Sequence, residues 1–264
     1  MSNPKDSVKQ TLIVAAALCL VCSVLVSGAA VMLKPTQEYN RALDRKRNIL
    51  QAAGLMQSDG DIDTLFKQIE PRVVDLEKGT FVETADAATY DQRKASRDPK
   101  LSTSLTVDQD VAGIKRRADQ ASVYLVRDAA GGIQKIILPV HGYGLWSTMY
   151  GFLALDGDAR TVVGFKFYQQ GETPGLGGEI ANPEWQALWV GKQVLDDDGR
   201  PAIQLVKGGV DPDSANAVHQ VDALSGATLT SNGVANLLQF WLGKDGFGPF
   251  LTSMREQQGV SKNG

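Results

Sequence analysis

Cysteine is scarce in this chain of 264 residues, and its only two copies, Cys19 and Cys22, lie inside an apolar run near the N-terminus. A Cys-x-x-Cys spacing is typical of redox and metal motifs, but a reactive thiolate needs water or positive charge beside it. Neither is found in that run, so we interpret both cysteines as small apolar residues. The remaining sequence has no cysteine, which excludes disulfides, cysteine-ligated iron–sulfur clusters and Cys-x-x-Cys-His haem attachment there.

The chain also has few histidines and no excess of basic residues. The two histidines are too few for a histidine-rich metal site or a multihaem carrier, so no metal site is predicted. The net charge is -3, and no basic stripe with interleaved aromatic residues is present. This composition gives no reason to expect nucleic acid as a partner.

A long uncharged run, rich in Leu, Val and Ala, covers residues 11–33. As a helix, a run of this length matches the hydrocarbon core of a bilayer. The alternative is a cleaved signal peptide, with Ser27-Gly28-Ala29 as the cleavage site, but the run is longer than a usual signal core. We therefore predict a transmembrane helix over 11–33, in contact with membrane lipid and preceded by a short cytoplasmic N-terminus over 1–10.

The charges that flank this run bear on the orientation of the chain. The basic residues are Lys5 and Lys9 before the run, and Lys34, Arg41, Arg45, Lys46 and Arg47 after it. The excess after the run favours a cytoplasmic C-terminal domain by the positive-inside rule. Long domains are translocated largely regardless of charge, so the sequence alone leaves the side open.

The region between the run and the main domain, residues 34–120, reads as a linker helix followed by a membrane-proximal α/β region. A charged helical stretch leads from the membrane, and apolar spacing predicts a short helix over 62–69. A strand is predicted over 73–76. The polar residues 86–108 read as an exposed helix and loop.

The second half of the chain, residues 121–250, predicts an α+β domain. Alternating apolar residues around Gly- and Asp-rich turns predict hairpins over 122–140 and 149–169, and a third over 194–207. Apolar residues at helical spacing predict a helix over 232–242. Hairpins with segregated helices indicate an antiparallel sheet plus helices, in contrast to alternating βαβ units.

The chain then ends in residues 251–264, which read as a loose polar tail.

The most informative stretch runs from Asp222 to Ser231, with the sequence Asp-Ala-Leu-Ser-Gly-Ala-Thr-Leu-Thr-Ser. It is a turn of small residues leading into a helix, where free N–H groups and the helix dipole favour a phosphate. It resembles the motif of proteins that carry FMN as a phosphoester on threonine, and Thr228 matches the modified threonine. The alternative is an unmodified capping turn, with Thr230 or Ser231 as the N-cap.

Two glycine-rich loops and one lysine are further candidates for a ligand site. The loop 141–148 has the sequence His-Gly-Tyr-Gly-Leu-Trp-Ser-Thr, and 170–179 has Gln-Gly-Glu-Thr-Pro-Gly-Leu-Gly-Gly-Glu. Glycines let the backbone approach a flat ligand, and the aromatic and leucine side chains offer apolar walls. Lys207, beside two glycines, is placed to face a phosphate or an anionic ring edge, or else simply ends a hairpin.

Taken in order behind one span, these segments resemble the NqrC family, whose FMN-binding domain belongs to the Na+-translocating NADH:quinone reductase. The resemblance covers nearly the whole chain. It implies that Thr228 bears one covalent FMN, transferred from FAD by a dedicated flavin transferase that reads Asp222 and the residues after it. The other residues implied to bind the cofactor are Ser225, Gly226, Ala227, Leu229, Thr230, Trp146, Glu172, Thr173, Gly175, Leu176, Gly177 and Lys207.

The resemblance further implies a subunit of a Na+-transporting NADH:ubiquinone reductase, a translocase of the bacterial inner membrane, with the C-terminal domain in the periplasm. This protein would take electrons from a redox metal in neighbouring membrane subunits and pass them to a flavin in another subunit. One alternative is the single-span subunit with the same attachment motif in the related ferredoxin:NAD+ electron-transport (Rnf) complex. The other, from a different class, is an anchored binding or assembly protein without redox chemistry.

Overall fold

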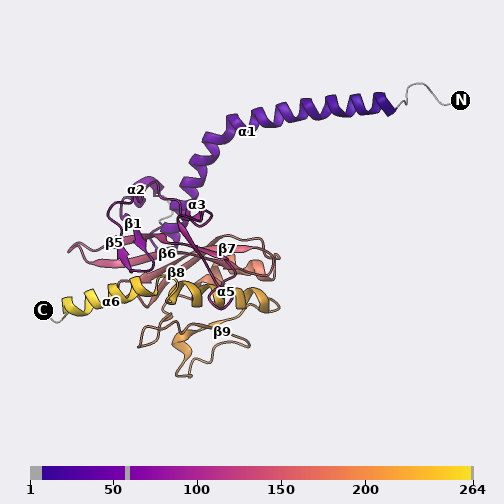
Figure 1. Cartoon of the computed structure of the whole chain (residues 1–264). Coiled ribbons are helices and arrows are strands. Elements are labelled where there is room, and N and C mark those ends of the chain that lie inside the picture. Colours follow the sequence, from indigo (N-terminus) through magenta and orange to yellow (C-terminus); the bar gives the residue numbers. More distant parts are fainter. Residues whose placement is uncertain (1–7, 57–59, 263–264) are drawn as a thin grey trace. The chain divides into compact units, whose positions relative to one another are not determined.

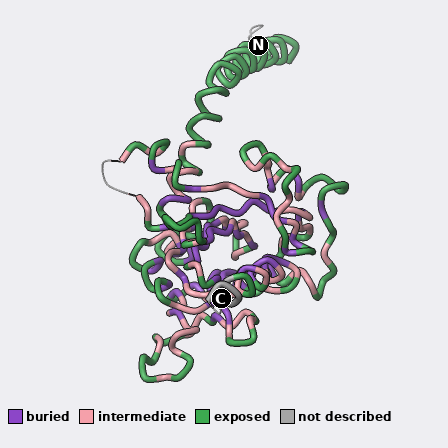
Figure 2. The backbone as a smooth tube through the Cα atoms, turned by 90° about the vertical axis from the view of Figure 1, so that its left-hand side faces the viewer, coloured by how far each residue is buried: buried purple, intermediate pink, exposed green. Residues whose placement is uncertain are grey.

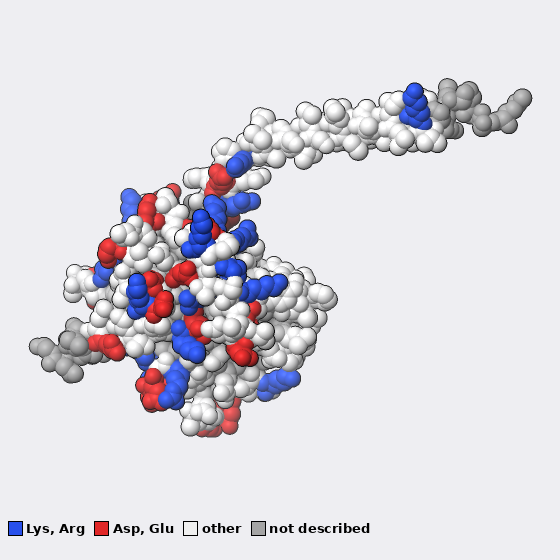
Figure 3. Space-filling model, in the orientation of Figure 1, with Lys and Arg blue, Asp and Glu red and all other residues white. Residues whose placement is uncertain are grey.

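The N-terminal helix is longer than the predicted span. In this computed structural model, which describes residues 8–56 and 60–262, helix α1 runs from Val8 to Ala52 and contains Pro35. The helix is long and apolar enough to cross a membrane, and Figure 3 shows its apolar part free of charged side chains. The predicted linker helix is thus a continuation of the same helix. Most of the predicted N-terminus 1–10 lies outside the described residues.

The described residues from Lys46 onward, which include the last turns of α1, form one compact body built on an antiparallel sheet. Six strands are arranged in the order β2-β1-β5-β6-β7-β8 (Figure 1). Their bounds are β1 Ile69–Asp75, β2 Thr80–Phe81, β5 Gln120–Arg127, β6 Ile133–Tyr143, β7 Thr148–Asp156 and β8 Val162–Gln169. The first two predicted hairpins correspond to β5–β6 and β7–β8, and the α+β fold class is confirmed.

Alternation along the strands buries both faces of this sheet (Figure 2). On one face, Val123 and Leu125 of β5 belong to a core shared with helices α5 (Thr228–Leu242) and α6 (Gly248–Lys262). On the other face, the intervening Tyr124 packs in a second core with the end of α1 and with α2 (Ile62–Phe66). Figure 1 shows α5 and α2 on opposite sides of the sheet.

The third predicted hairpin forms only next to its turn, where the amide of Asp196 donates to the carbonyl oxygen of Arg200 and that of Ala202 to the carbonyl oxygen of Val194, both at 2.9 Å. Strand β9 (Gln204–Val206) pairs in parallel with β10 (Gln220–Asp222), while Leu195 and Pro201 form only an isolated bridge. Val194 and Leu195 are buried in the main core, and the chain after Pro201 leaves them to pair with β10. The pairing brings the chain directly into the loop before α5.

Three helix boundaries differ from the predicted ones. Helix α2 ends at Phe66, because Ile69 already begins β1. Helix α5 begins at Thr228, four residues before the predicted start. Residues 251–262 of the predicted polar tail 251–264 belong to helix α6, whose Leu251 and Met254 are buried against the core, and the last two lie outside the described residues.

The polar region 86–108, predicted to be exposed, is partly buried against the sheet, with Gln92 and Ala95 at most 7% exposed. The Tyr90 hydroxyl donates to the carbonyl oxygen of Gln120 in β5 at 2.8 Å, and Oε1 of Gln92 accepts from the amide of Ser122 at 3.2 Å. Arg93 of α3 (Gln92–Ala95) has its guanidinium 3.5 Å from the ring centroid of Tyr150 and donates hydrogen bonds to Tyr168 and Gln169. A cation over an aromatic ring is stabilising, and more so when partly desolvated. The remaining short elements are β3 Ser102–Ser104, β4 Arg116–Ala118, η1 Gly177–Ala181, α4 Pro183–Ala187 and η2 Ala217–His219.

Candidate functional site

The start of helix α5 carries no side-chain cap. Its N-cap residue is Ala227, which has no oxygen to accept a hydrogen bond from the first-turn amides. The alternative prediction, with Thr230 or Ser231 as N-cap, is wrong because both lie inside the helix. The Ser231 hydroxyl instead accepts a hydrogen bond from the amide of Leu224 at 3.0 Å, which closes the preceding turn. The helix start therefore keeps amides available for an anion.

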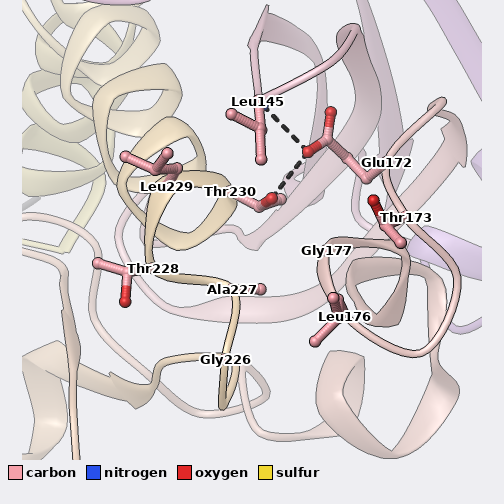
Figure 4. Close-up of a pocket in the computed structure, with 10 residues that line it drawn as sticks. All are labelled: Leu145, Glu172, Thr173, Leu176, Gly177, Gly226, Ala227, Thr228, Leu229 and Thr230. Atoms are coloured by element: carbon pink, nitrogen blue, oxygen red, sulfur yellow. Dashed lines mark hydrogen bonds between the residues drawn. The ribbon is translucent and has the colours of Figure 1, made fainter.

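The two threonines of this first turn differ in their surroundings. The Thr228 side chain is half-buried, and its hydroxyl has no hydrogen-bond partner among the residues that the structure describes. The Thr230 side chain is only 2% exposed, and its hydroxyl donates to Oε2 of Glu172 at 2.7 Å. Figure 4 shows the Thr228 hydroxyl turned away from Thr230. Of the two, Thr228 has the more accessible hydroxyl.

The carboxylate of Glu172 connects three separate segments. Besides Thr230, it accepts hydrogen bonds from the backbone amides of Leu145, Trp146 and Ser147, at 3.0, 3.0 and 3.1 Å. Burial raises the pKa of Glu172, but the hydrogen bonds from Thr230 and the three amides outweigh it and leave the pKa below its usual range. The residue is therefore a buried, charged acceptor that also lines the pocket described below.

Glycines at two positions make room for this carboxylate. A Cβ atom on Gly144 would lie 2.6 Å from Oε1 of Glu172, and one on Gly177 would collide with the Thr230 hydroxyl. Both glycines belong to the glycine-rich loops noted in the sequence. Their part in the site is to let these segments close around the carboxylate.

A small open pocket lies where the β6–β7 turn, the loop after β8 and the α5 start meet (Figure 4). Its volume is about 200 Å³, below the roughly 300–1,000 Å³ of pockets that enclose a drug-sized ligand. Leucine side chains on its rim are exposed by 40% (Leu145), 44% (Leu176) and 59% (Leu229). The pocket is lined by Leu145, Glu172, Thr173, Leu176, Gly177, Gly226, Ala227, Thr228, Leu229 and Thr230. A flat apolar ligand would be held here by part of its surface only.

Five of the predicted site residues are not among those that line the pocket. They are Trp146, Gly175, Lys207, Asp222 and Ser225. Trp146 is 66% exposed on the same turn as Leu145, and Lys207 follows strand β9 at the surface. Leu145, which was not among the residues predicted from the sequence, does line the pocket. Its position between a glycine and a tryptophan in a glycine-rich loop could have indicated that it lines the site.

Asp222 lies at the end of β10 and shapes the turn before it. Its Oδ1 accepts a hydrogen bond from the amide of Val210 at 2.7 Å, and its carbonyl oxygen accepts one from the indole of Trp185 at 2.9 Å. The aspartate thus ties the 207–210 turn to the strand that leads into α5. These contacts hold the backbone ahead of Thr228.

The residues present fit a phosphate-linked flat ring better than a metal. No group of three or more His, Cys, Asp or Glu side chains suited to a metal occurs in the described part of the chain. The uncapped helix start and the free Thr228 hydroxyl suit a phosphate, and the exposed leucines suit a ring. The site therefore suits a phosphorylated aromatic cofactor.

Comparison with known proteins agrees with this chemistry. Residues 144–243 match the FMN-binding domain family. The chain is 57% identical over 260 residues to the NqrC protein of the Na(+)-translocating NADH-quinone reductase of Pseudomonas aeruginosa, covering 97% of this chain and 99% of the relative. It is 54% identical to the same component of the Yersinia pestis reductase, covering 98% and 97% of the two chains.

Solved structures give the same result. The crystal structure of NqrC from Shewanella oneidensis is similar with a TM-score of 0.74 and 37% identity, covering 81% of this chain and 97% of that one. The crystal structure of the same reductase component from Parabacteroides distasonis is similar with a TM-score of 0.65 and 30% identity, covering 83% and 97%.

Proposed function

The chain belongs to the NqrC family of Na+-translocating NADH-quinone reductases, and on this premise we propose that it carries one FMN covalently on Thr228 and relays electrons through it. Membership makes it part of a multi-subunit reductase, with an FMN-binding domain and, within the described residues, one candidate membrane span. The proposal adds three things to this membership, namely the covalent bond to Thr228, the route of the electrons and the side of the membrane on which the domain lies. The two relatives described above are both NqrC proteins, so the ferredoxin-dependent Rnf alternative is set aside.

The free hydroxyl of Thr228 is the observation that carries the proposal. In the proposed transfer, its Oγ would form a bond to the FMN phosphorus of FAD, and the pyrophosphate bond to AMP would break. AMP would leave with the bridging oxygen, and the threonine proton would pass to the solvent or the transferase. The first-turn amides and the positive end of α5 would then face the phosphate charge.

The pocket residues would hold the rest of the cofactor. Leu145, Leu176 and Leu229 offer exposed apolar contacts, and the Thr173 side chain adds a polar group. Bound FMN supplies reversible electron transfer, and the protein supplies its position and electrostatics. Because the pocket encloses only part of a ligand of this size, one edge would stay open toward a redox partner.

The proposed partners follow from this arrangement. A redox metal in neighbouring membrane subunits would be the electron donor and a second flavin subunit the acceptor, while a flavin transferase would load Thr228. The domain would lie on the periplasmic side of a bacterial inner membrane. A covalent link suits such a domain, because a cofactor lost outside the cytoplasm is not easily replaced.

Intact mass of the membrane-extracted chain tests the proposal. We expect the mass of the uncleaved chain plus one FMN minus water, with flavin fluorescence in the denatured protein. Thr228→Ala should lose both the added mass and the fluorescence. Thr252→Ala, at an exposed position on α6, is the matched control and should keep them. Full flavin loading of the Thr228→Ala variant would refute the assignment and move attention to Thr230.

A further inference from the structure

The carboxylate of Glu172 holds the three walls of the pocket together. One oxygen bonds to the Thr230 hydroxyl in the first turn of α5, and both oxygens bond to the amides of residues 145–147 in the β6–β7 turn. Glu172 itself begins the loop that supplies Thr173, Leu176 and Gly177. We propose, resting on the function proposed above, that Glu172 is the positioning residue of the flavin site, and that its negative charge lowers the reduction potential of the flavin.

The hydrogen bonds require an ionised carboxylate. All four partners are donors, namely three backbone N–H groups and one hydroxyl, and each carboxylate oxygen accepts two of them. A glutamine at this position would bring an NH2 group against N–H donors and leave at least one of them unsatisfied. A buried donor without a partner is costly, so the segments would separate.

The segments that Glu172 joins are distant in the sequence. Its amide partners lie 25 to 27 positions away, and Thr230 lies 58 positions away. Gly144 and Gly177 leave the space in which the carboxylate reaches them. Thr228 lies two residues before Thr230. The distance from Thr228 to the β6–β7 turn and to the loop after β8 therefore depends on the Glu172 side chain.

The same charge acts on the redox chemistry. Glu172 is only 4% exposed, so water screens its charge weakly. A fixed negative charge in the wall of the pocket opposes the addition of electrons to a bound flavin. Loss of that charge favours the reduced cofactor and raises its potential.

Hydrogen exchange of the full-length, detergent-solubilised chain tests the positioning role without flavin. In apoprotein, Glu172→Gln should speed amide exchange at residues 145–147 by about tenfold or more, because these amides lose their acceptor. Glu184→Gln changes an exposed glutamate of α4 and should leave the exchange unchanged. Equal protection of residues 145–147 in the Glu172→Gln variant and the wild type would overturn the positioning role.

A second pair of variants avoids the risk that Glu172→Gln fails to fold. Thr230→Val removes the hydroxyl at nearly constant volume and should slow FMN transfer from FAD about tenfold, whereas Thr230→Ser should restore it. Equal transfer rates for the valine and serine variants would contradict the link from Glu172 to α5.

The midpoint potential of the loaded protein tests the charge. It should be more positive in Glu172→Gln than in the wild type and unchanged in Glu184→Gln. An unchanged potential in a loaded Glu172→Gln variant would overturn the electrostatic role. Wild-type chain without covalent FMN would instead refute the proposed function, and the exchange experiment would still decide the positioning role.

Discussion

Two threonines in the first turn of α5 show how much a residue's role depends on its partners. Thr228 and Thr230 are two positions apart, yet one hydroxyl is free and the other is bonded to a buried carboxylate. The partly exposed position of Thr228 near the helix start could be anticipated from a motif that is local in the sequence, and its role as the attachment site stays a prediction. The role of Glu172 could not be anticipated, since its partners are brought to it only by the fold.

His141 gives the domain a pH-dependent stability. Burial, with a smaller contribution from the positive charge of Arg93, lowers the pKa of His141 to about 4. Its ring stacks on Tyr150, with 5.4 Å between centroids, and lies 4.9 Å from that of Trp241. The imidazole is thus neutral in the native state, whereas in the unfolded chain it takes up a proton near pH 6.5.

We expect the free energy of unfolding to fall as the pH drops from about 6.5 to about 4, by up to about 3 kcal/mol from this group. Below the folded pKa both states are protonated, so this contribution changes no further. Urea unfolding at several pH values measures the effect. His141→Phe keeps an aromatic ring without a titrating group and should flatten this part of the profile. An equally steep profile in that variant would assign the pH dependence to other groups.

At the scale of elements, α5 is held on the sheet by close contacts with β6. A Cβ on Gly142 would lie 2.9 Å from the Cβ of Leu237, and one on Gly233 would lie 2.7 Å from the carbonyl oxygen of Tyr143. The indole of Trp241 also donates to the carbonyl oxygen of His141 at 2.6 Å. These glycines let the helix approach the strand, and this approach fixes the site at the helix start.

Leu237 tests this packing, because its side chain is fully buried between the helix and the sheet. Leu237→Ala should lower the free energy of unfolding by about 2–5 kcal/mol, from lost apolar burial and the cavity left behind. Chemical denaturation of the full chain measures the change. The control, Leu188→Ala, alters a leucine that is 40% exposed and should cost less than about 1 kcal/mol. Similar losses in both variants would argue against a packed α5–β6 interface.

The elements that the sequence predicted best are the hairpins with short turns. Gly131-Gly132 and Asp156-Gly157-Asp158 punctuate alternating strands, so β5–β6 and β7–β8 follow from local signals. The parallel pair of β9 and β10 was missed because its register joins Gln204 to Gln220 across a long connection. Local pattern carries no information about such a pairing.

On the scale of the whole molecule, the C-terminal helix completes the main core. Phe250, Leu251 and Met254 of α6 are at most 3% exposed and belong to the same cluster as α5 and the sheet. The sequence did not predict this helix, because its apolar residues occupy only the first turns of α6 and the residues after Met254 are polar.

We expect a chain that stops after Gly246 to lose several kcal/mol of stability, because each buried side chain of this size contributes about 1.5–3 kcal/mol. Yield and melting temperature of the purified protein would report the loss. A chain that stops after Gln257 keeps all three side chains and should match the full-length protein. A normal melting temperature for the shorter chain would show that α6 is dispensable.

The missing cap of α5 also affects how the protein matures. Where other helices carry an Asp or Asn at the N-cap, this one has Ala227, so the chain leaves the positive helix end uncompensated during folding. A phosphoester on Thr228 would supply the absent anion, worth roughly 0.3–1 kcal/mol at an exposed helix end. Attachment of the cofactor would then be the last step that stabilises the folded domain. Chains without the cofactor would assemble into the complex less readily and would be cleaved faster by proteases.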